Sequence, residues 1–214
     1  SWSNSVLMAK SLEDILGKRN VDIASPDAKA SKKIEIEIVS KLAEISDENT
    51  QAATLLETLK TDTVSLSFLA HVFALSSYLK DCALIRSQIM AQCLSAPFPQ
   101  VLSEIIRQTR ESWRDRPDQS KIMTDLRIAK RKVSLTLGLA DMGRWLRPDE
   151  VTRYLSEFAD AALSATINYL LAELHHSGKV VVADPDNPAK DSGLIALGMG
   201  KYGAYELNYS SDID

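Results

Sequence analysis

The chain has 214 residues, of which 45% are hydrophobic, and a net charge of −4. This length supports one or two domains with a sizeable core, and the acidic balance excludes a general basic surface for nucleic acid. No apolar run approaches the roughly 18 residues of a membrane-spanning helix, and the N-terminus lacks a signal-peptide pattern. We therefore expect a cytoplasmic protein with neither membrane nor nucleic-acid partners.

The first two thirds of the chain have the apolar spacing of helices. Ser25-Pro26-Asp27 has the residue types of a helix start, and the helix predicted after it extends to about Ile45. Further helices are predicted near 46–59, 64–79, 81–94 and 102–106, and residues 107–119, which are charged and contain a proline, are predicted to form an exposed loop. Cys82 and Cys93 lack metal-binding spacing and are expected to be buried, reduced thiols.

Two longer helices are predicted next. The first extends from Lys121 to Met142 and carries a basic cluster, Arg127, Lys130, Arg131 and Lys132, which is either a solvated face or a patch facing phosphate or a partner. The second begins at Pro148, with Asp149 and Glu150 in its first turn, and extends to about His176. Its apolar residues recur widely enough to predict burial on two sides.

The last part of the chain changes character from helix to strand. Strands are predicted near 179–183, 193–198 and 211–214, because short apolar or alternating segments alternate there with turn residues. The fold class is therefore mainly α: a helical region, 1–145, followed by 146–214, which comprises the second long helix and the first strands of an α/β domain. Because three short strands do not make a stable sheet, we expect the chain to be a truncated piece of a longer protein.

The residues from 198 to 214 have the chemistry of a phosphate and metal site. Glycines at 198, 200 and 203 allow the backbone to approach an anion, and Lys201 adds a positive charge. Ser210 and Ser211 follow, and Asp212 and Asp214 would lie on one face of a strand, where two carboxylates suit Mg²⁺. The G-x-G-x-x-G spacing also occurs in dinucleotide-binding loops, but here the carboxylates follow too soon and no helix-forming segment comes next.

The whole string, from Gly198-Met199-Gly200-Lys201 through Glu206-Leu207-Asn208 to Ser210-Ser211-Asp212-Ile213-Asp214, resembles the signature of the glutamine synthetase adenylyltransferase/adenylyl-removing family. We call residues 198–214 the signature. The resemblance extends more weakly upstream, over roughly residues 64–214. Tyr202 stands where leucine is usual and Ala204 where a second glycine is usual, so Ala204 is not expected to need a positive φ.

The resemblance implies a function for each part of the signature. The ending is more similar to the N-terminal copy of the two nucleotidyltransferase domains, which removes AMP from a tyrosine of glutamine synthetase by Mg²⁺-dependent phosphorolysis and yields ADP. By the same resemblance, Asp212 and Asp214 are the catalytic and metal-binding residues. The phosphate or nucleotide contacts come from Gly198, Gly200, Lys201, Gly203, Ser210 and Ser211. The implied partners are glutamine synthetase, a PII-type signal protein, ADP or ATP, and inorganic phosphate.

Two other hypotheses remain open on the sequence. The chain could be a helical interaction module without catalysis, or it could belong to a different nucleotidyltransferase, such as a protein uridylyltransferase or an antibiotic-modifying enzyme. Those enzymes share a glycine–serine and Asp-x-Asp plan but lack the complete Gly-Lys-x-Gly-x-x-Glu-Leu-Asn string.

Overall fold

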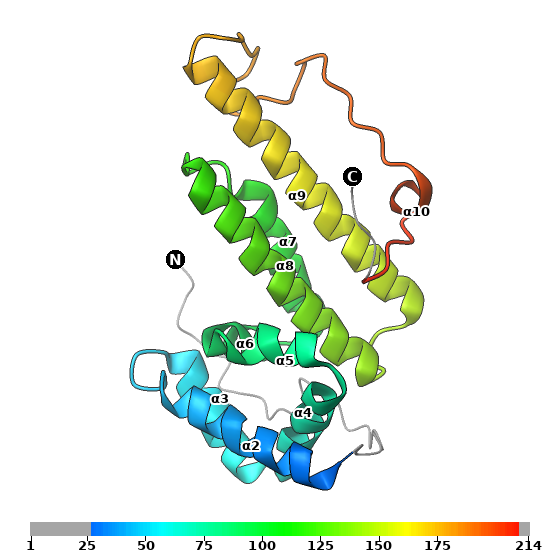
Figure 1. Ribbon diagram of the computed structural model, residues 1–214. Helices are drawn as coiled ribbons and strands as arrows, with labels where there is room; N and C mark the ends of the chain where they lie inside the picture. Colours follow the sequence, from blue (N-terminus) through cyan, green and yellow to red (C-terminus); the bar gives the residue numbers. More distant parts are fainter. Residues whose placement is uncertain (1–26, 210–214) are drawn as a thin grey trace. The chain divides into compact units, whose positions relative to one another are not determined.

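The computed structural model describes residues 27–209, in which every regular element is a helix (Figure 1). The mainly α fold class is thereby confirmed for the described residues. The helices are α2 (Ala28–Ala43), α3 (Thr50–Thr61), α4 (Thr63–Leu75), α5 (Ser77–Leu84), α6 (Ser87–Cys93), α7 (Phe98–Glu111), α8 (Gln119–Met142), α9 (Pro148–His176) and α10 (Gly200–Gly203). None of the helices in the described range combines the length and apolarity that a membrane crossing requires.

The chain divides into two compact units. Among the described residues, the first unit contains 27–101 together with 134–147, and the second contains 102–133 together with 148–209. Helices α7 and α8 each contribute one part to each unit. The two units are therefore interleaved in the sequence.

In the first unit, side-chain caps fix where four helices begin. Asp27, Asn49, Asp62 and Ser76 each accept a hydrogen bond from a backbone N–H in the first turn of α2, α3, α4 and α5. Such caps satisfy donors that have no partner within the helix. The predicted cap at residues 46–48 is wrong, since Asn49 has that role, and Ser25 and Pro26 lie outside the described residues. Because Ser76 starts a new helix, the predicted helix 64–79 ends at Leu75.

The core of the first unit forms where α2 packs against α3, α4 and α6. Ile38, Leu42, Leu59 and Leu69 are completely buried there. Trp145 packs against Phe68 and Phe98, with ring centroids 5.2 Å and 5.6 Å apart. Cys82 and Cys93 are both buried, as predicted.

In the second unit, α9 packs against the first part of α8. Trp113, Ile122, Ala165 and Tyr169 form a buried cluster, flanked by Leu126 and Ala172. The predicted bounds of α9 are confirmed at Pro148 and His176. The predicted second buried side is wrong near its C-terminal end, because Leu170 is 52% exposed.

The predicted loop 107–119 is only partly correct. Helix α7 continues to Glu111, Thr109 donates from its hydroxyl to the Ile105 carbonyl at 2.8 Å, and Trp113 is buried in the cluster just described. Ile105, Thr109 and Trp113 are each four residues apart, a spacing that places them on one side of a helix. The apolar spacing thus continues into a segment whose charges suggested a loop.

The strands predicted near 179–183 and 193–198 are not formed in the described residues. Both segments are non-helical, and no ladder joins them; Val180 and Val182 instead lie near the His175 ring, with the Val180 carbonyl oxygen 3.3 Å from Nδ1. Leu194, Ile195 and Leu197 are 57%, 79% and 80% exposed. A strand needs neighbouring strands for its hydrogen bonds, and the described residues supply none. The third predicted strand, 211–214, lies outside the described residues.

Candidate functional site

The first part of the signature forms a single helical turn, α10, which begins after the non-helical segment 193–199. The Gly203 N–H donates to the Met199 carbonyl at 3.1 Å, the Ala204 N–H to Gly200 at 3.0 Å, and the Glu206 N–H to Lys201 at 2.8 Å. Met199 makes no side-chain cap. The turn is therefore closed by its own backbone, with no side-chain cap at its N-terminus.

Two glycines of the turn are required by its geometry. Gly200 has a φ of +56°, the left-handed region that glycine adopts without strain. A Cβ placed on Gly203 would lie 2.3 Å from the Gly198 carbonyl oxygen, so only glycine fits at position 203. Ala204 has a φ of −84°, which confirms that this position does not need glycine.

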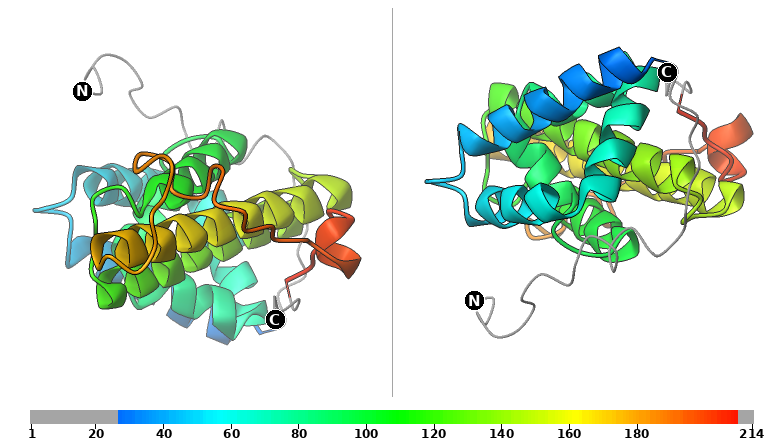
Figure 2. Two further views of the ribbon diagram at one scale, coloured as in Figure 1. Left: turned by 90° about the horizontal axis from the view of Figure 1, so that it is seen from above. Right: turned by 90° about the horizontal axis from the view of Figure 1, so that it is seen from below.

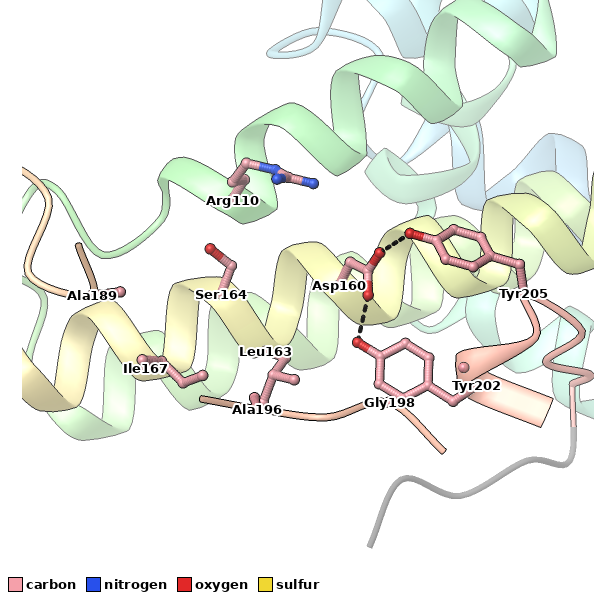
Figure 3. Close-up of a pocket in the computed structure, with 11 residues that line it drawn as sticks. Arg110, Asp160, Leu163, Ser164, Ile167, Ala189, Ala196, Gly198, Tyr202 and Tyr205 are labelled. Atoms are coloured by element: carbon pink, nitrogen blue, oxygen red, sulfur yellow. Dashed lines mark hydrogen bonds between the residues drawn. The ribbon is translucent and has the colours of Figure 1, made fainter. Parts of the chain in front are cut away.

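A cavity of about 640 Å³ lies beside the turn, between it and helix α9 (Figure 3). Among the predicted site residues, Gly198 and Gly203 line it, whereas Gly200 and Lys201 are exposed and do not. The complete lining is Arg110, Asp160, Leu163, Ser164, Ile167, Ala189, Ala196, Gly198, Tyr202, Gly203 and Tyr205. Ser210, Ser211, Asp212 and Asp214 lie outside the described residues.

Helix α9 holds the returning chain at several points. The Ala189 N–H donates to Oδ1 of the buried Asn168 at 3.0 Å, and the Leu207 N–H lies 3.4 Å from the hydroxyl oxygen of Ser156. Between these points, the Tyr202 hydroxyl donates to Oδ1 of Asp160 at 2.6 Å, and the Tyr205 hydroxyl donates to Oδ2. The segment after α9 therefore runs back along the helix toward its N-terminal part, as Figures 1 and 2 show.

Sequence reasoning missed these polar positions on α9. Ser156, Asp160, Ser164 and Asn168 follow one another at intervals of four residues, which places them along one side of the helix. The apolar stripe of the same helix is the stronger feature of its sequence. The regular four-residue spacing of these polar residues within an apolar helix is the signal that could have identified the side of α9 that holds the returning chain.

The electrostatics of the site keep both phenols protonated. Burial, and then the hydrogen bond to Asp160, raise the pKa of Tyr202 well above its ordinary value. The hydrogen bond to Asp160 is the main reason that the pKa of Tyr205 is raised, with the Asp160 charge adding to it and the nearby Arg110 opposing it. A phenol whose pKa is raised remains a hydrogen-bond donor at neutral pH.

The basic cluster on α8 does not belong to this site. None of Arg127, Lys130, Arg131 and Lys132 lines the cavity, and Arg127 instead borders a smaller hollow with Gln119, Ser120, Met123 and Thr124. Arg110, which the sequence analysis placed in a loop, is the cation that lines the cavity (Figure 3).

No cluster of three or more metal-ligating side chains occurs within residues 27–209. Asp212 and Asp214, the proposed ligands, are outside that range. Their paired carboxylates are the hard oxygen donors that Mg²⁺ prefers, so the donor set fits this metal.

Comparison with known proteins agrees with the signature. The family model described as glutamate-ammonia ligase adenylyltransferase matches residues 66–214. A bifunctional glutamine synthetase adenylyltransferase/adenylyl-removing enzyme from Agrobacterium fabrum is 44% identical over 151 residues, covering 69% of this chain and 15% of that relative. The enzyme of the same description from Rhizobium meliloti is 39% identical over 213 residues, covering 97% of this chain and 21% of the relative. No solved structure matches the chain.

These matches identify the class of protein. The chain belongs to the glutamate-ammonia ligase adenylyltransferase family, a nucleotidyltransferase family. It spans between 15% and 21% of the length of these two relatives.

Proposed function

We propose that the chain is part of a cytoplasmic enzyme that removes AMP from a tyrosine of glutamine synthetase. Inorganic phosphate attacks the AMP phosphorus, the new phosphoanhydride bond gives ADP, and the tyrosine oxygen leaves and takes up a proton. The observation that carries this proposal is the signature itself, which lies inside the family match at residues 66–214 and ends in Asn-x-Ser-Ser-Asp-Ile-Asp.

The geometry of the turn supports a role in holding phosphate. Gly200 exposes its backbone in the left-handed conformation, and Lys201 next to it carries an exposed positive charge. Because phosphoryl transfer depends mainly on positioning and on charge stabilisation, a fixed glycine turn with an adjacent cation suits the reaction. Gly198, Gly203, Ser210 and Ser211 complete the proposed phosphate site.

Asp212 and Asp214 would hold Mg²⁺, which neutralises the charge that develops on the phosphoryl oxygens when it is bound. Residues 146–214 would then form the start of the nucleotidyltransferase domain. In the full protein we also propose addition of AMP from ATP, and regulation by a PII-type signal protein.

The test uses the full-length protein that carries this chain. It is incubated with adenylylated glutamine synthetase, Mg²⁺ and inorganic phosphate, with the PII-type protein in both modification states, and ADP release is followed. We expect Asp212→Asn to abolish ADP release, and Asp186→Asn, in the exposed turn outside the signature, to leave it unchanged.

Two results would contradict the proposal. Wild-type ADP release by the Asp212→Asn variant would remove the signature from the reaction. AMP transfer from ATP without any ADP formation from adenylylated glutamine synthetase would mean that this domain carries the opposite half-reaction.

A further inference from the structure

Asp160 joins helix α9 to the glycine turn through two hydrogen bonds. Its half-buried carboxylate accepts from the Tyr202 hydroxyl on Oδ1, at 2.6 Å, and from the Tyr205 hydroxyl on Oδ2 (Figure 3). Each oxygen therefore has its own donor, and hydrogen bonds to an ionised acceptor are stronger than those between neutral groups. We call these three residues the tyrosine clamp.

The turn needs such an anchor because it is too short to hold its own conformation. Helix α10 spans only Gly200–Gly203, and a single helical turn is not stable alone in water. Gly198, Gly200 and Gly203 add conformational freedom that must be lost when the turn forms. The segment before the turn is exposed at Leu197 and Met199, so apolar burial does not fix it in the described structure.

The backbone of Tyr205 gives a second, independent sign of anchoring. Its φ is +59°, a left-handed conformation that is unfavourable for a large aromatic residue. Such strain persists only where surrounding contacts determine the conformation. Within the described residues, the Tyr205 side chain is held by the hydrogen bond from its hydroxyl to Asp160.

The tyrosines of the clamp follow Gly200 and Lys201, which the proposed function places at the phosphate. Tyr202 immediately follows Lys201, and Tyr205 comes two residues after Gly203, so the two anchors lie on either side of the end of the turn. Ser156, one helical turn before Asp160, approaches the Leu207 N–H at 3.4 Å and holds the chain that continues toward the serines and aspartates. A displacement of the turn would move the backbone of Gly200 and the side chain of Lys201 together.

We propose that Asp160 is a positioning residue, which sets the glycine turn on α9 through Tyr202 and Tyr205 so that the turn can hold phosphate. The inference rests on the proposed function for the identity of the bound group. The clamp itself is independent of the proposed function, because its effect on the turn can be measured directly.

The experiment compares Tyr202→Phe, Tyr205→Phe, the double variant and Asp160→Asn in the full-length protein. We expect the double variant to lose about 10- to 100-fold in kcat/KM for phosphate, because misplacement by about 1 Å has effects of this size. The KM for adenylylated glutamine synthetase should stay unchanged, and the far-UV circular dichroism at the assay temperature should remain that of the wild type, which separates misplacement of the turn from general loss of structure. In the Asp160→Asn background, the tyrosine substitutions should add less than about twofold, because their shared acceptor is already impaired.

Two control variants on helix α9 remove the same kinds of chemical group as the clamp variants do. Tyr169→Phe removes a phenol hydroxyl and Glu173→Gln removes a carboxylate, and neither residue lines the cavity. Both should retain the wild-type kcat/KM for phosphate.

A second measurement separates the clamp from the proposed function. Trypsin cleaves after the exposed Lys201, and we expect the double variant to be cut there faster than the wild type. If the wild type releases no ADP, the proposed function fails, and the cleavage rates alone decide on the clamp. Equal cleavage after Lys201 in the wild type and the double variant would overturn the inference. If the wild type is active, a double variant that keeps the wild-type kcat/KM for phosphate would also overturn the inference. The same holds if Tyr169→Phe loses as much kcat/KM for phosphate as the double variant does.

Discussion

The two glycines of α10 are needed for different reasons. Gly203 has no room for a side chain, because its added Cβ would lie 2.3 Å from a backbone oxygen of Gly198. Gly200 has open space around it, with nothing within 4 Å of an added Cβ, but its φ is +56°. Substitution at Gly203 therefore forces the backbone apart, whereas substitution at Gly200 only introduces local strain.

We predict that Gly203→Ala opens the turn much more than Gly200→Ala does. The left-handed conformation costs an alanine about 1 kcal/mol, equivalent to roughly a fivefold shift of a local equilibrium. Trypsin cleavage after Lys201 in the full-length protein measures this opening, and the Gly203→Ala variant should be cut fastest. Gly178→Ala is the control. Gly178 also has a positive φ, +72°, and open space around it, but it follows the end of α9 and does not belong to the glycine turn. Similar cleavage rates for Gly203→Ala and Gly200→Ala would contradict the steric argument.

Helix α9 connects the apolar core of the second unit with the segment that returns along the helix. One part of its surface packs in the cluster with Trp113 and Ile122, and its polar positions hold the segment that returns along it. Asn168 connects two parts of this arrangement. Its Nδ2 donates to the Ser164 carbonyl at 2.9 Å, while its Oδ1 accepts from the Ala189 N–H at 3.0 Å.

We predict that Asn168→Ala loosens the turn segment 183–192 while α9 remains helical. The Ala189 N–H loses its acceptor, at a cost of about 1–3 kcal/mol for a donor left unsatisfied. Amide hydrogen exchange in the full-length protein should become faster across residues 184–192. Thr166→Ala is the control, because the Thr166 hydroxyl donates only within its own helix, to the Ala162 carbonyl at 2.8 Å. Unchanged exchange in the Asn168→Ala variant would show that other contacts hold the segment.

The helices could be predicted from the sequence because their signals are local. Pro148 with two acids after it marks the start of α9, and the spacing of Val151, Leu155 and Phe158 marks its buried side. A strand cannot be predicted from local signals alone, since its hydrogen bonds come from other segments of the chain. The valines at 180–182 and the apolar run 194–197 have a composition typical of strands, yet they have no regular secondary structure and form no ladder in the described residues.

The same distinction applies to the candidate site. The glycines at 198, 200 and 203 could be identified because their spacing is contained in a short string. Asp160 could not be paired with Tyr202 and Tyr205, because they are more than 40 residues apart and only the path of the returning chain brings them together. Arg110 was missed for the same reason.

At the scale of the whole molecule, the raised pKa values of the tyrosines predict loss of stability at high pH. An ordinary phenol ionises near pH 10. In the folded protein the pKa values of Tyr202 and Tyr205 are higher, so the folded state retains protons that the unfolded state has lost. The stabilisation is therefore complete below about pH 10 and decreases as the pH rises toward the folded values. Ionised phenols beside Asp160 would also repel its carboxylate.

The measurement is urea unfolding of the full-length protein at several pH values between about 8 and 11. The free energy of unfolding of the Tyr202→Phe/Tyr205→Phe variant should fall less steeply with pH than that of the wild type. The pKa of Tyr169 is also raised, chiefly by burial, so the variant should keep part of the dependence. An identical slope in the two proteins would mean that these phenols do not contribute.

The interleaving of the two units determines the order in which the chain can complete its folding during synthesis. The first unit consists of residues up to 101 and residues 134–147, with Trp145 packed against Phe68 and Phe98. Ribosomes add residues from the N-terminus onward at about 5–20 per second. The first unit must therefore wait, with part of its apolar surface uncovered, until residues 102–133 of the other unit and then its own residues 134–147 have been made. During this interval of a few seconds, we expect the nascent chain to bind chaperones that recognise exposed apolar segments.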